Sequence, residues 1–355
     1  MYGIIKKMGR CLWLLMALGC GKQPNSDAPV HALALQGADM SYLPEVRASG
    51  TVYYNVAGQQ EDMLLTLKKA GANLVRLRLW KDPVSPTSGL PMVKALCNEI
   101  KSMGLKTLIT VHYSDTWADP GHQTKPAVWQ SLSNSQLNDS LYAYTRQVVT
   151  ALQPDYIQLG NEINNGLLWP DGSAANMSNM RALLKTAIRA VRDAGGGTKI
   201  VIHYAGVDNA PAFFVNLADL DYDVIGISYY PQWHGKDLQV FKQALIGLSQ
   251  SHRQSILLAE TAYPFSLGWN DFTNNVLGNT SQILPSYPAT PQGQKDFLWQ
   301  IKTMMAEVPK GLGFCYWGSE WVSYKGNTAT DGSAWENQAF WDFSNKALPV
   351  LDAYR

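Results

Sequence analysis

Two glutamates stand where apolar, strand-like segments of the chain end. In YIQLGNEINNG, residues 156–166, the apolar run stops at Gly160 and Asn161-Glu162 follows at once, while SILLAE, residues 255–260, closes on Glu260. Two carboxyl groups about 5 Å apart can break a glycosidic bond with retention, because one attacks the anomeric carbon while the other protonates the leaving oxygen. A lone glutamate after a strand more often interacts with the positive amino end of the next helix. The glycosidase chemistry therefore requires a fold that brings these two glutamates together.

The segments around the two glutamates predict such a fold. Segments of helical spacing alternate with apolar, strand-like runs at residues 33–37, 74–79, 107–111, 156–159, 199–202, 224–227, 256–259 and 313–316. This alternation indicates a parallel sheet, and eight strands over this length are the number found in a single (β/α)8 TIM barrel. No low-complexity linker divides residues 32–355, so we predict one α/β domain there.

In a barrel of this kind the loops that follow the strands meet at one mouth, where the chemistry takes place. Glu162 and Glu260 follow the fourth and seventh strands, and we expect them to face each other across that mouth. Other polar or aromatic residues at predicted strand ends are Asp39, Arg76, Arg78, Trp80, His112, Asp115, His203, Tyr229 and Trp317. The sequence therefore predicts a candidate catalytic site at this end of the barrel.

The neighbours of the two glutamates predict different protonation states for them. Glu260 is expected to be ionised beside Arg76 or Arg78, with Tyr229 as a hydrogen-bond donor, whereas Glu162 needs a drier setting to stay protonated until it is used. Asn161 is suited to hold a sugar 2-hydroxyl group. The two histidines, His112 and His203, fit either this site or ordinary hydrogen-bonded core positions.

Composition excludes several other classes of function. The chain has 355 residues, 46% hydrophobic and 16% charged, with a formal net charge of +1 and no long basic block, so we expect no nucleic-acid partner. Its 12 Trp and 17 Tyr pack the core or offer flat faces to sugars. No HExxH, cysteine-rich pair or EF-hand spacing predicts a metal, and the glycines at 195–197 precede a strand, which does not suit phosphate binding.

The first 20 residues are typical of an export signal. Lys6, Lys7 and Arg10 precede a short apolar run at 11–18, and the following Gly19-Cys20 is similar to a bacterial lipoprotein box. We therefore expect residues 1–20 to be a signal, Cys20 to be acylated and residues 21–31 to be a linker, which would anchor the protein at the cell surface or in the periplasm. Ordinary secretion and a misassigned start remain alternatives. The other two cysteines, at 97 and 315, are expected to be buried thiols.

A set of motifs gives the chain a specific resemblance. The motifs are GADMSYL, VRLRLWKDP, HYSDTWADPGHQTKPAVW, QLGNEIN, ISYYPQW, AETAYP and WENQAFWDFSNKALPVL, spread over residues 35–353. Together they resemble the family 53 glycoside hydrolases, the arabinogalactan endo-β-1,4-galactanases of clan A, whose members are retaining barrels. The resemblance implies cleavage of internal β-1,4-galactosyl bonds in galactan and in the type I arabinogalactan side chains of pectin, through a covalent galactosyl-enzyme.

The same resemblance implies roles for individual residues. Glu162 in GNEIN matches the acid/base and Glu260 in AETAYP matches the nucleophile. The residues that match positions around the cleaved sugar are Asn161, Arg76, His112 and Tyr229, with Trp317 as an aromatic floor. In the long third loop, cleft contacts are expected from Asp115, Trp117 and Asp119.

Two departures from the family pattern limit what carries over. YWGSEW replaces the common Tyr-Trp-Glu-Pro, which leaves the role of Glu320 open. Some bacterial relatives hold calcium in an acidic loop after the seventh strand, but here residues 264–288 contain only Asp271 as an acid, so we expect no calcium and no cofactor. The loop is then available to shape the subsites that bind sugars.

Other readings of the sequence remain open. The chain could instead be a clan A hydrolase of mannan or xylan, or a surface glycan-binding lipoprotein whose barrel has lost catalysis. In each case we expect a monomer.

Overall fold

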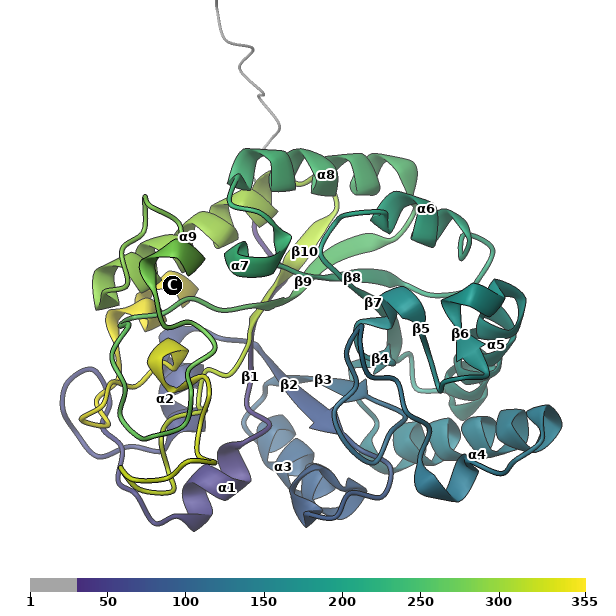
Figure 1. The fold of residues 1–355 in the computed structure, drawn as a ribbon, viewed down its shortest axis with the longest axis horizontal. Helices are drawn as coiled ribbons and strands as arrows, with labels where there is room; N and C mark the ends of the chain where they lie inside the picture. Colours follow the sequence, from purple (N-terminus) through teal and green to yellow (C-terminus); the bar gives the residue numbers. More distant parts are fainter. Residues whose placement is uncertain (1–30) are drawn as a thin grey trace, which may run out of the picture.

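The computed structural model describes residues 31–355. The predicted signal, Cys20 and the linker up to residue 30 lie outside the described residues. In the described part, eight parallel strands close a barrel and helices surround it (Figure 1). The strands are β1 (Leu35–Asp39), β2 (Leu74–Leu79), β3 (Lys106–Val111), β4 (Tyr156–Leu159), β7 (Lys199–Ala205), β8 (Val224–Ser228), β9 (Ser255–Thr261) and β10 (Gly311–Tyr316). The predicted (β/α)8 barrel is confirmed, and each predicted run overlaps one strand.

Helices follow the strands in chain order, and most of them cover the outside of the barrel. They are α1 (Leu43–Ala48), α2 (Met63–Ala70), α3 (Leu90–Ser102), α4 (Asn134–Leu152), α5 (Met177–Ala194), α6 (Ala210–Val215), α7 (Pro231–His234), α8 (Leu238–Ser251) and α9 (Pro291–Glu307). The short α7 lies at the mouth of the barrel. Side chains at their first residues explain several starts: the Asp62 carboxylate accepts from the backbone of α2, and Ser133 forms a capping box with Gln136 at α4. A two-stranded sheet, β5 (Gly166–Leu167) with β6 (Gly172–Ser173), lies in the loop after β4.

Strand alternation builds the barrel interior in layers. Near the amino ends of the strands an apolar cluster fills the interior, with members such as Leu74, Val201 and Leu257. Because side chains on a strand alternate between its two faces, the residues two positions further on also point inward, and these include Arg76 and His203. The interior therefore changes from apolar to polar toward the mouth, which places charged groups where a substrate can enter.

Closure of the barrel depends on one glycine. β1 pairs with β10 in parallel, with Leu35 opposite Gly313. A side chain at Gly313 would run into the backbone of Leu35, so only glycine lets the first and last strands meet. The register of this seam runs as far as Ala38 opposite Tyr316, directly before Asp39 and Trp317.

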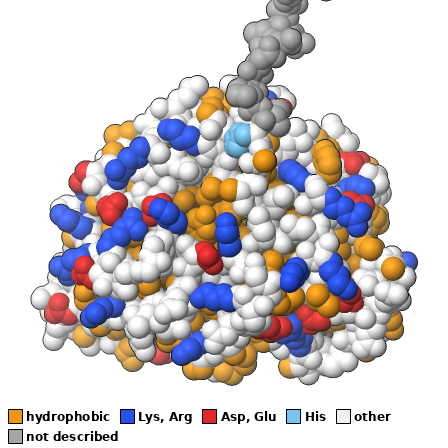
Figure 2. Space-filling model, turned by 180° about the vertical axis from the view of Figure 1, so that it is seen from behind, with side chains coloured by type: hydrophobic (Ala, Val, Ile, Leu, Met, Phe, Trp, Pro, Cys, Tyr) orange, Lys and Arg blue, Asp and Glu red, His pale blue; other side chains and the backbone are white. Residues whose placement is uncertain are grey.

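The remaining features agree with the composition. Cys97 and Cys315 are buried free thiols, as predicted. On the face shown in Figure 2, Lys and Arg side chains are interspersed with Asp and Glu and with apolar side chains. Among the helices of residues 31–355, none has the length and apolarity that a membrane crossing requires.

Candidate active site

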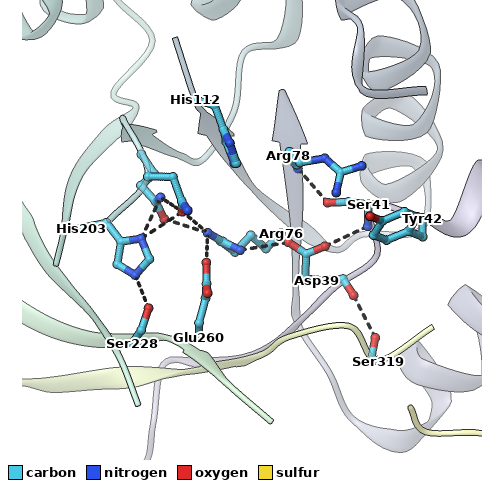
Figure 3. A network of polar contacts seen from close by, with 12 residues as sticks. Asp39, Ser41, Tyr42, Arg76, Arg78, His112, His203, Ser228, Glu260 and Ser319 are labelled. Atoms are coloured by element: carbon cyan, nitrogen blue, oxygen red, sulfur yellow. Dashed lines mark hydrogen bonds and ion pairs between the residues drawn. The ribbon is translucent and has the colours of Figure 1, made fainter. Parts of the chain in front are cut away.

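A buried arginine joins two carboxylates at the mouth of the barrel. Arg76 on β2 is 1% exposed; its Nη1 lies 3.1 Å from Asp39 Oδ2 and its Nη2 lies 2.6 Å from Glu260 Oε1 (Figure 3). A buried charge is costly unless it is paired, so the guanidinium and the two carboxylates stabilise one another. Of the two arginines considered from sequence, Arg76 is the partner of Glu260. Arg78 instead lies over the rings of three aromatic residues, Tyr42, Trp80 and Trp117.

A bulge turns Glu260 into the site. Leu257 and Ala259 already face the barrel interior, so strict alternation would point Glu260 outward. The register between β8 and β9 shifts from Ile227 opposite Leu258 to Ser228 opposite Glu260. One extra residue on β9 thus resets the alternation, a common use of bulges beside active sites.

The hydrogen-bond donor to Glu260 is Tyr230, which corrects the expectation for Tyr229. The Tyr230 hydroxyl donates to Glu260 Oε2 at 3.0 Å, whereas the Tyr229 hydroxyl donates to the Gly235 carbonyl and its ring stacks on Phe241 of α8. The reason is the alternation along β8, because Ser228 points inward and its successor must point outward. Counting by twos along ISYY would have found Tyr230.

Glu162 lies in a different environment. It is half-buried, adopts a left-handed backbone conformation with φ of 47°, and its Oε1 accepts a hydrogen bond from Ser228 Oγ at 2.6 Å. No cation contacts it among the described residues. Burial, together with the nearby charge of Glu260, raises the pKa of Glu162 to about 8. At neutral pH Glu162 is therefore protonated.

Glu260 loses its proton before Glu162 does. Burial raises the pKa of Glu260 as well, but Arg76 and the Tyr230 hydroxyl oppose that rise. Since the two glutamates interact, they titrate as a pair, and the first proton leaves the member that has the cation. The site thus holds one carboxylate and one carboxylic acid.

Asn161 and the residues behind it form a hydrogen-bonded layer. Asn161 Oδ1 accepts from Arg76 Nη2 and from Gln158 Nε2, both at 3.0 Å, and its Nδ2 donates to the Ala118 carbonyl. Fully buried His203 contacts Gln158 and Ser228. The sequence assigns no role to Gln158 or Ser228, although each lies an even number of residues from an inward-facing neighbour, which is the signal that could have found them.

The third loop is held by His112. Its Nδ1 accepts from Ala118 N at 3.0 Å and from Trp80 Nε1 at 3.3 Å. Burial and the nearby Arg78 keep the pKa of His112 well below its usual range, so the ring is neutral. Asp115 differs from expectation: its carboxylate accepts from the backbone of Asp82 and Ala127 and lies outside the pocket lining, so it ties two loops together.

The two glutamates open into one pocket of about 480 Å³. Of the predicted residues, the lining contains Asn161, Glu162, Glu260, Trp117, Asp119 and Trp317. Behind the lining, Arg76, His112 and His203 are hydrogen-bonded to lining residues, and Asp39 is bonded to Arg76. Aromatic side chains to which the sequence assigns no role complete the walls: Tyr230, Trp233, Trp321 and Trp335. Flat apolar walls around paired carboxyl groups suit a sugar.

The loop after β10 supports one wall without adding a catalytic carboxylate. Glu320 is fully buried and its Oε1 accepts from Tyr42 N at 2.6 Å, so it binds backbone and lies outside the pocket lining. Trp321 stacks on Tyr42 with 3.9 Å between ring centroids. Residues 31–355 contain no cluster of three or more His, Cys, Asp or Glu arranged to hold a metal.

Comparisons with known proteins agree with this site. The profile of Glycosyl hydrolase family 53 matches residues 35–354. An arabinogalactan endo-beta-1,4-galactanase of Cellvibrio japonicus is 35% identical over 336 residues, covering 89% of each chain. The Ignisphaera aggregans GH53 catalytic domain superposes with a TM-score of 0.88 at 38% identity, over 92% of this chain and 97% of that one. A fungal β-1,4-galactanase structure gives a TM-score of 0.81 at 29% identity, over 91% and 99% of the chains. The chain therefore belongs to glycosyl hydrolase family 53.

Proposed function

We propose that this protein is an endo-acting retaining glycoside hydrolase that cleaves β-1,4-galactosidic bonds in galactan and in the type I arabinogalactan side chains of pectin. One observation carries the proposal: two glutamates share an aromatic-walled pocket, and only one of them contacts a guanidinium. The similarity to named galactanases supports the choice of galactan over other β-glycans.

The proposed reaction uses the two glutamates in turn. Glu260 attacks C1 of the galactosyl unit while Glu162 transfers its proton to the departing glycosidic oxygen, which leaves a covalent galactosyl ester. Glu162, now a carboxylate, then takes a proton from water as the water oxygen attacks C1, and Glu260 departs as a carboxylate. Two inversions give net retention.

Substrate binding is assigned to the walls of the pocket. Asn161 is proposed to meet the 2-hydroxyl group and Trp317 to lie under the cleaved sugar. The aromatic lining runs from Trp117 in the third loop to Trp233 and Trp335 after later strands, which suits a chain of sugars. Arg76, Asp39, His112 and His203 support these groups from behind.

Incubation with potato galactan, xylan and mannan tests the substrate. Galactan alone should yield oligomers of mixed length, and ¹H NMR of the first products should show the β-anomer. Release of products from xylan or mannan instead would favour the clan A alternative. Binding to galactan without turnover would favour the surface glycan-binding role.

Export and lipid anchoring at Cys20 rest on sequence alone, and we propose both together with a monomeric state. Labelling with a radioactive fatty acid should mark the wild type and spare Cys20→Ala. Light scattering should return a mass near 39.2 kDa, less the removed signal.

The pH dependence of kcat/KM should be bell-shaped. The alkaline limb should fall near pH 8, because Glu162 must carry its proton to act as an acid and its pKa lies at about 8. The acid limb reports Glu260, which must be ionised to attack. Initial rates on galactan across the pH range measure both limbs, and activity that keeps rising above pH 9 would contradict the acid role of Glu162.

Tyr230→Phe should move the acid limb upward and lower kcat/KM about tenfold, because a hydrogen bond to a charged group contributes roughly 1.5–3 kcal/mol. The Tyr230 hydroxyl favours ionised Glu260, and its own pKa is raised well above the usual value by burial and by Glu260, so it remains a donor. Tyr229→Phe is the matched control, since that hydroxyl bonds to Gly235 outside the pocket. Equal pH profiles of kcat/KM for the two variants would contradict the role of Tyr230 in favouring ionised Glu260.

Removal of divalent cations should leave the protein unchanged. Both carboxylate oxygens of Asp271 already accept hydrogen bonds, from Thr273 N at 2.7 Å and Ser323 Oγ at 2.9 Å. Melting curves with EDTA and with calcium should coincide, as should galactan turnover. A Tm that falls with EDTA and returns with calcium would instead assign a cation beside Asp271. Asn275 Oδ1 of the same loop and Glu336 Oε2 of the segment after β10 are buried there without a partner among residues 31–355.

A further inference from the structure

A buried hydroxyl group links Glu162 to a histidine deeper in the barrel. Ser228 Oγ lies 2.6 Å from Glu162 Oε1 and 2.9 Å from His203 Nε2, and both Ser228 and His203 are fully buried. They come from neighbouring strands, β8 and β7, while Glu162 follows β4. Figure 3 shows the contact between Ser228 and His203 next to the arginine network.

A backbone N–H group determines which atoms carry the protons along the link from His203 through Ser228 to Glu162. The backbone N–H of Glu162 donates to His203 Nδ1 at 3.3 Å, and a backbone N–H can only donate. Nδ1 is therefore an acceptor, so the ring proton of neutral His203 is on Nε2 and is donated to Ser228 Oγ. The hydroxyl hydrogen of Ser228 is then left for Glu162 Oε1.

The surroundings of His203 agree with this assignment. Burial and the nearby Arg76 hold the pKa of His203 well below its usual range, so the ring carries one proton. Asn161 Oδ1 lies 3.1 Å from Nδ1, but it already accepts from Arg76 and Gln158. The proton order therefore runs from His203 through Ser228 to Glu162.

The second oxygen of Glu162 is free for the substrate. Oε2 accepts no hydrogen bond from residues 31–355 and is not among their buried unpartnered atoms, while Glu162 itself lines the pocket. The two oxygens thus differ, since Oε1 faces a protein donor and Oε2 faces the space for the sugar.

We propose that Ser228 is a positioning residue for Glu162: oriented by His203, it keeps Oε1 as an acceptor, so that the proton Glu162 transfers is on Oε2. This inference rests on the acid/base role proposed for Glu162. In the first step the arrangement presents the proton to the glycosidic oxygen, and in the second it stabilises the carboxylate that takes a proton from water.

Loss of the Ser228 hydroxyl should raise the pKa of Glu162. The hydroxyl bonds to the ionised form, so its removal favours the protonated form. The other charged or titratable groups around Glu162 stay in place in such a variant: Glu260, Arg76, Asp119, His203, Tyr230 and His234.

Ser228→Ala, compared with the control Ser249→Ala, tests the proposal. Ser249 is also a fully buried serine, but it accepts from Lys310 N on the outer side of the barrel. Carboxyl ¹³C NMR, with Glu162→Gln to assign the signal, should show the Glu162 pKa about one unit higher in Ser228→Ala and unchanged in Ser249→Ala. The alkaline limb of kcat/KM on galactan should move upward with it.

Kinetics with an activated substrate should also show the effect of Ser228 on the second step, in which the galactosyl ester is hydrolysed. With a dinitrophenyl β-galactobioside, whose leaving group needs little acid assistance, hydrolysis of the galactosyl ester limits kcat, and Ser228→Ala should lower it about tenfold. Ser228→Thr, which keeps the hydroxyl, should return the limb toward its original position. The ¹⁵N spectrum of His203 should show the proton on Nε2 and none on Nδ1.

Two results would overturn the proposal. One is a folded Ser228→Ala whose Glu162 titrates as in the wild type or at lower pH; the other is a His203 that carries its proton on Nδ1. Failure of the wild type to hydrolyse galactan would count against the proposed function instead, because the NMR titration needs no substrate.

Discussion

Glu260→Ala is expected to lower kcat on galactan roughly 10⁶-fold, the scale on which loss of a nucleophile acts in other covalent enzymes. The carboxylate that would form the galactosyl ester is gone, and Arg76 Nη2 loses its 2.6 Å partner. Initial rates with galactan measure the loss. Binding of galacto-oligosaccharides should remain measurable, because the aromatic walls of the pocket are intact.

Azide can identify the missing group by stereochemistry. In Glu260→Ala a small anion fits the vacated space and attacks C1 directly, so a dinitrophenyl β-galactobioside should give the α-galactosyl azide after one inversion. Glu336→Gln is the matched control, since Glu336 is a buried glutamate outside the pocket lining. Near-normal turnover by Glu260→Ala, or a β-azide product, would assign the nucleophile elsewhere.

The barrel could be predicted because its strands are buried on both faces. Such strands appear in the sequence as continuous apolar runs, and all eight predicted runs overlap strands of the structure. The same argument placed Glu162 and Glu260 at the mouth, because the carboxyl ends of parallel strands meet there. The periodicity of the sequence thus predicts the order of strands and helices along the chain, and with it which end of each strand lies at the mouth.

The orientation of side chains at the strand ends was harder to predict. Tyr229 was expected to contact Glu260, but the inward neighbour, Tyr230, does so. Glu260 itself reaches the pocket through a bulge, and a bulge depends on pairing between β8 and β9, which no single strand encodes. The direction of the Asp115 side chain, which binds the backbone of two loops, was not predictable for a related reason, since loop residues have no period that fixes their direction.

The aromatic walls of the pocket could not be predicted from the sequence. Trp321 and Trp335 lie in the irregular segment after β10, where Trp321 stacks on Tyr42 and Trp335 meets Trp317 edge to face. Contacts between residues so distant in sequence leave no local pattern. The charge difference between the two glutamates was predictable in kind, but its cause needed the structure, which shows that Arg76 reaches Glu260 and that Ser228 reaches Glu162.

Glu162→Gln is expected to lower kcat/KM on galactan about 10²- to 10⁴-fold, the range that general acid catalysis contributes. Glutamine cannot donate a proton to the glycosidic oxygen, yet it keeps the size of the side chain and can still accept from Ser228. The alkaline limb near pH 8 should disappear, because the group that titrates there is gone. Initial rates on galactan across the pH range measure both effects.

The choice of leaving group separates an acid from a group that only shapes the pocket. With a dinitrophenyl β-galactobioside the first step needs little protonation, so Glu162→Gln should form the galactosyl ester at close to the normal rate and then hydrolyse it slowly, giving a burst. Azide needs no general base, so it should accelerate turnover and give the β-galactosyl azide after two inversions, the opposite anomer from Glu260→Ala. An equal loss on galactan and on the activated substrate, with no burst, would mean that Glu162 neither donates a proton to the leaving group nor takes one from water. The different surroundings of Glu162 and Glu260 would then have to serve substrate binding alone.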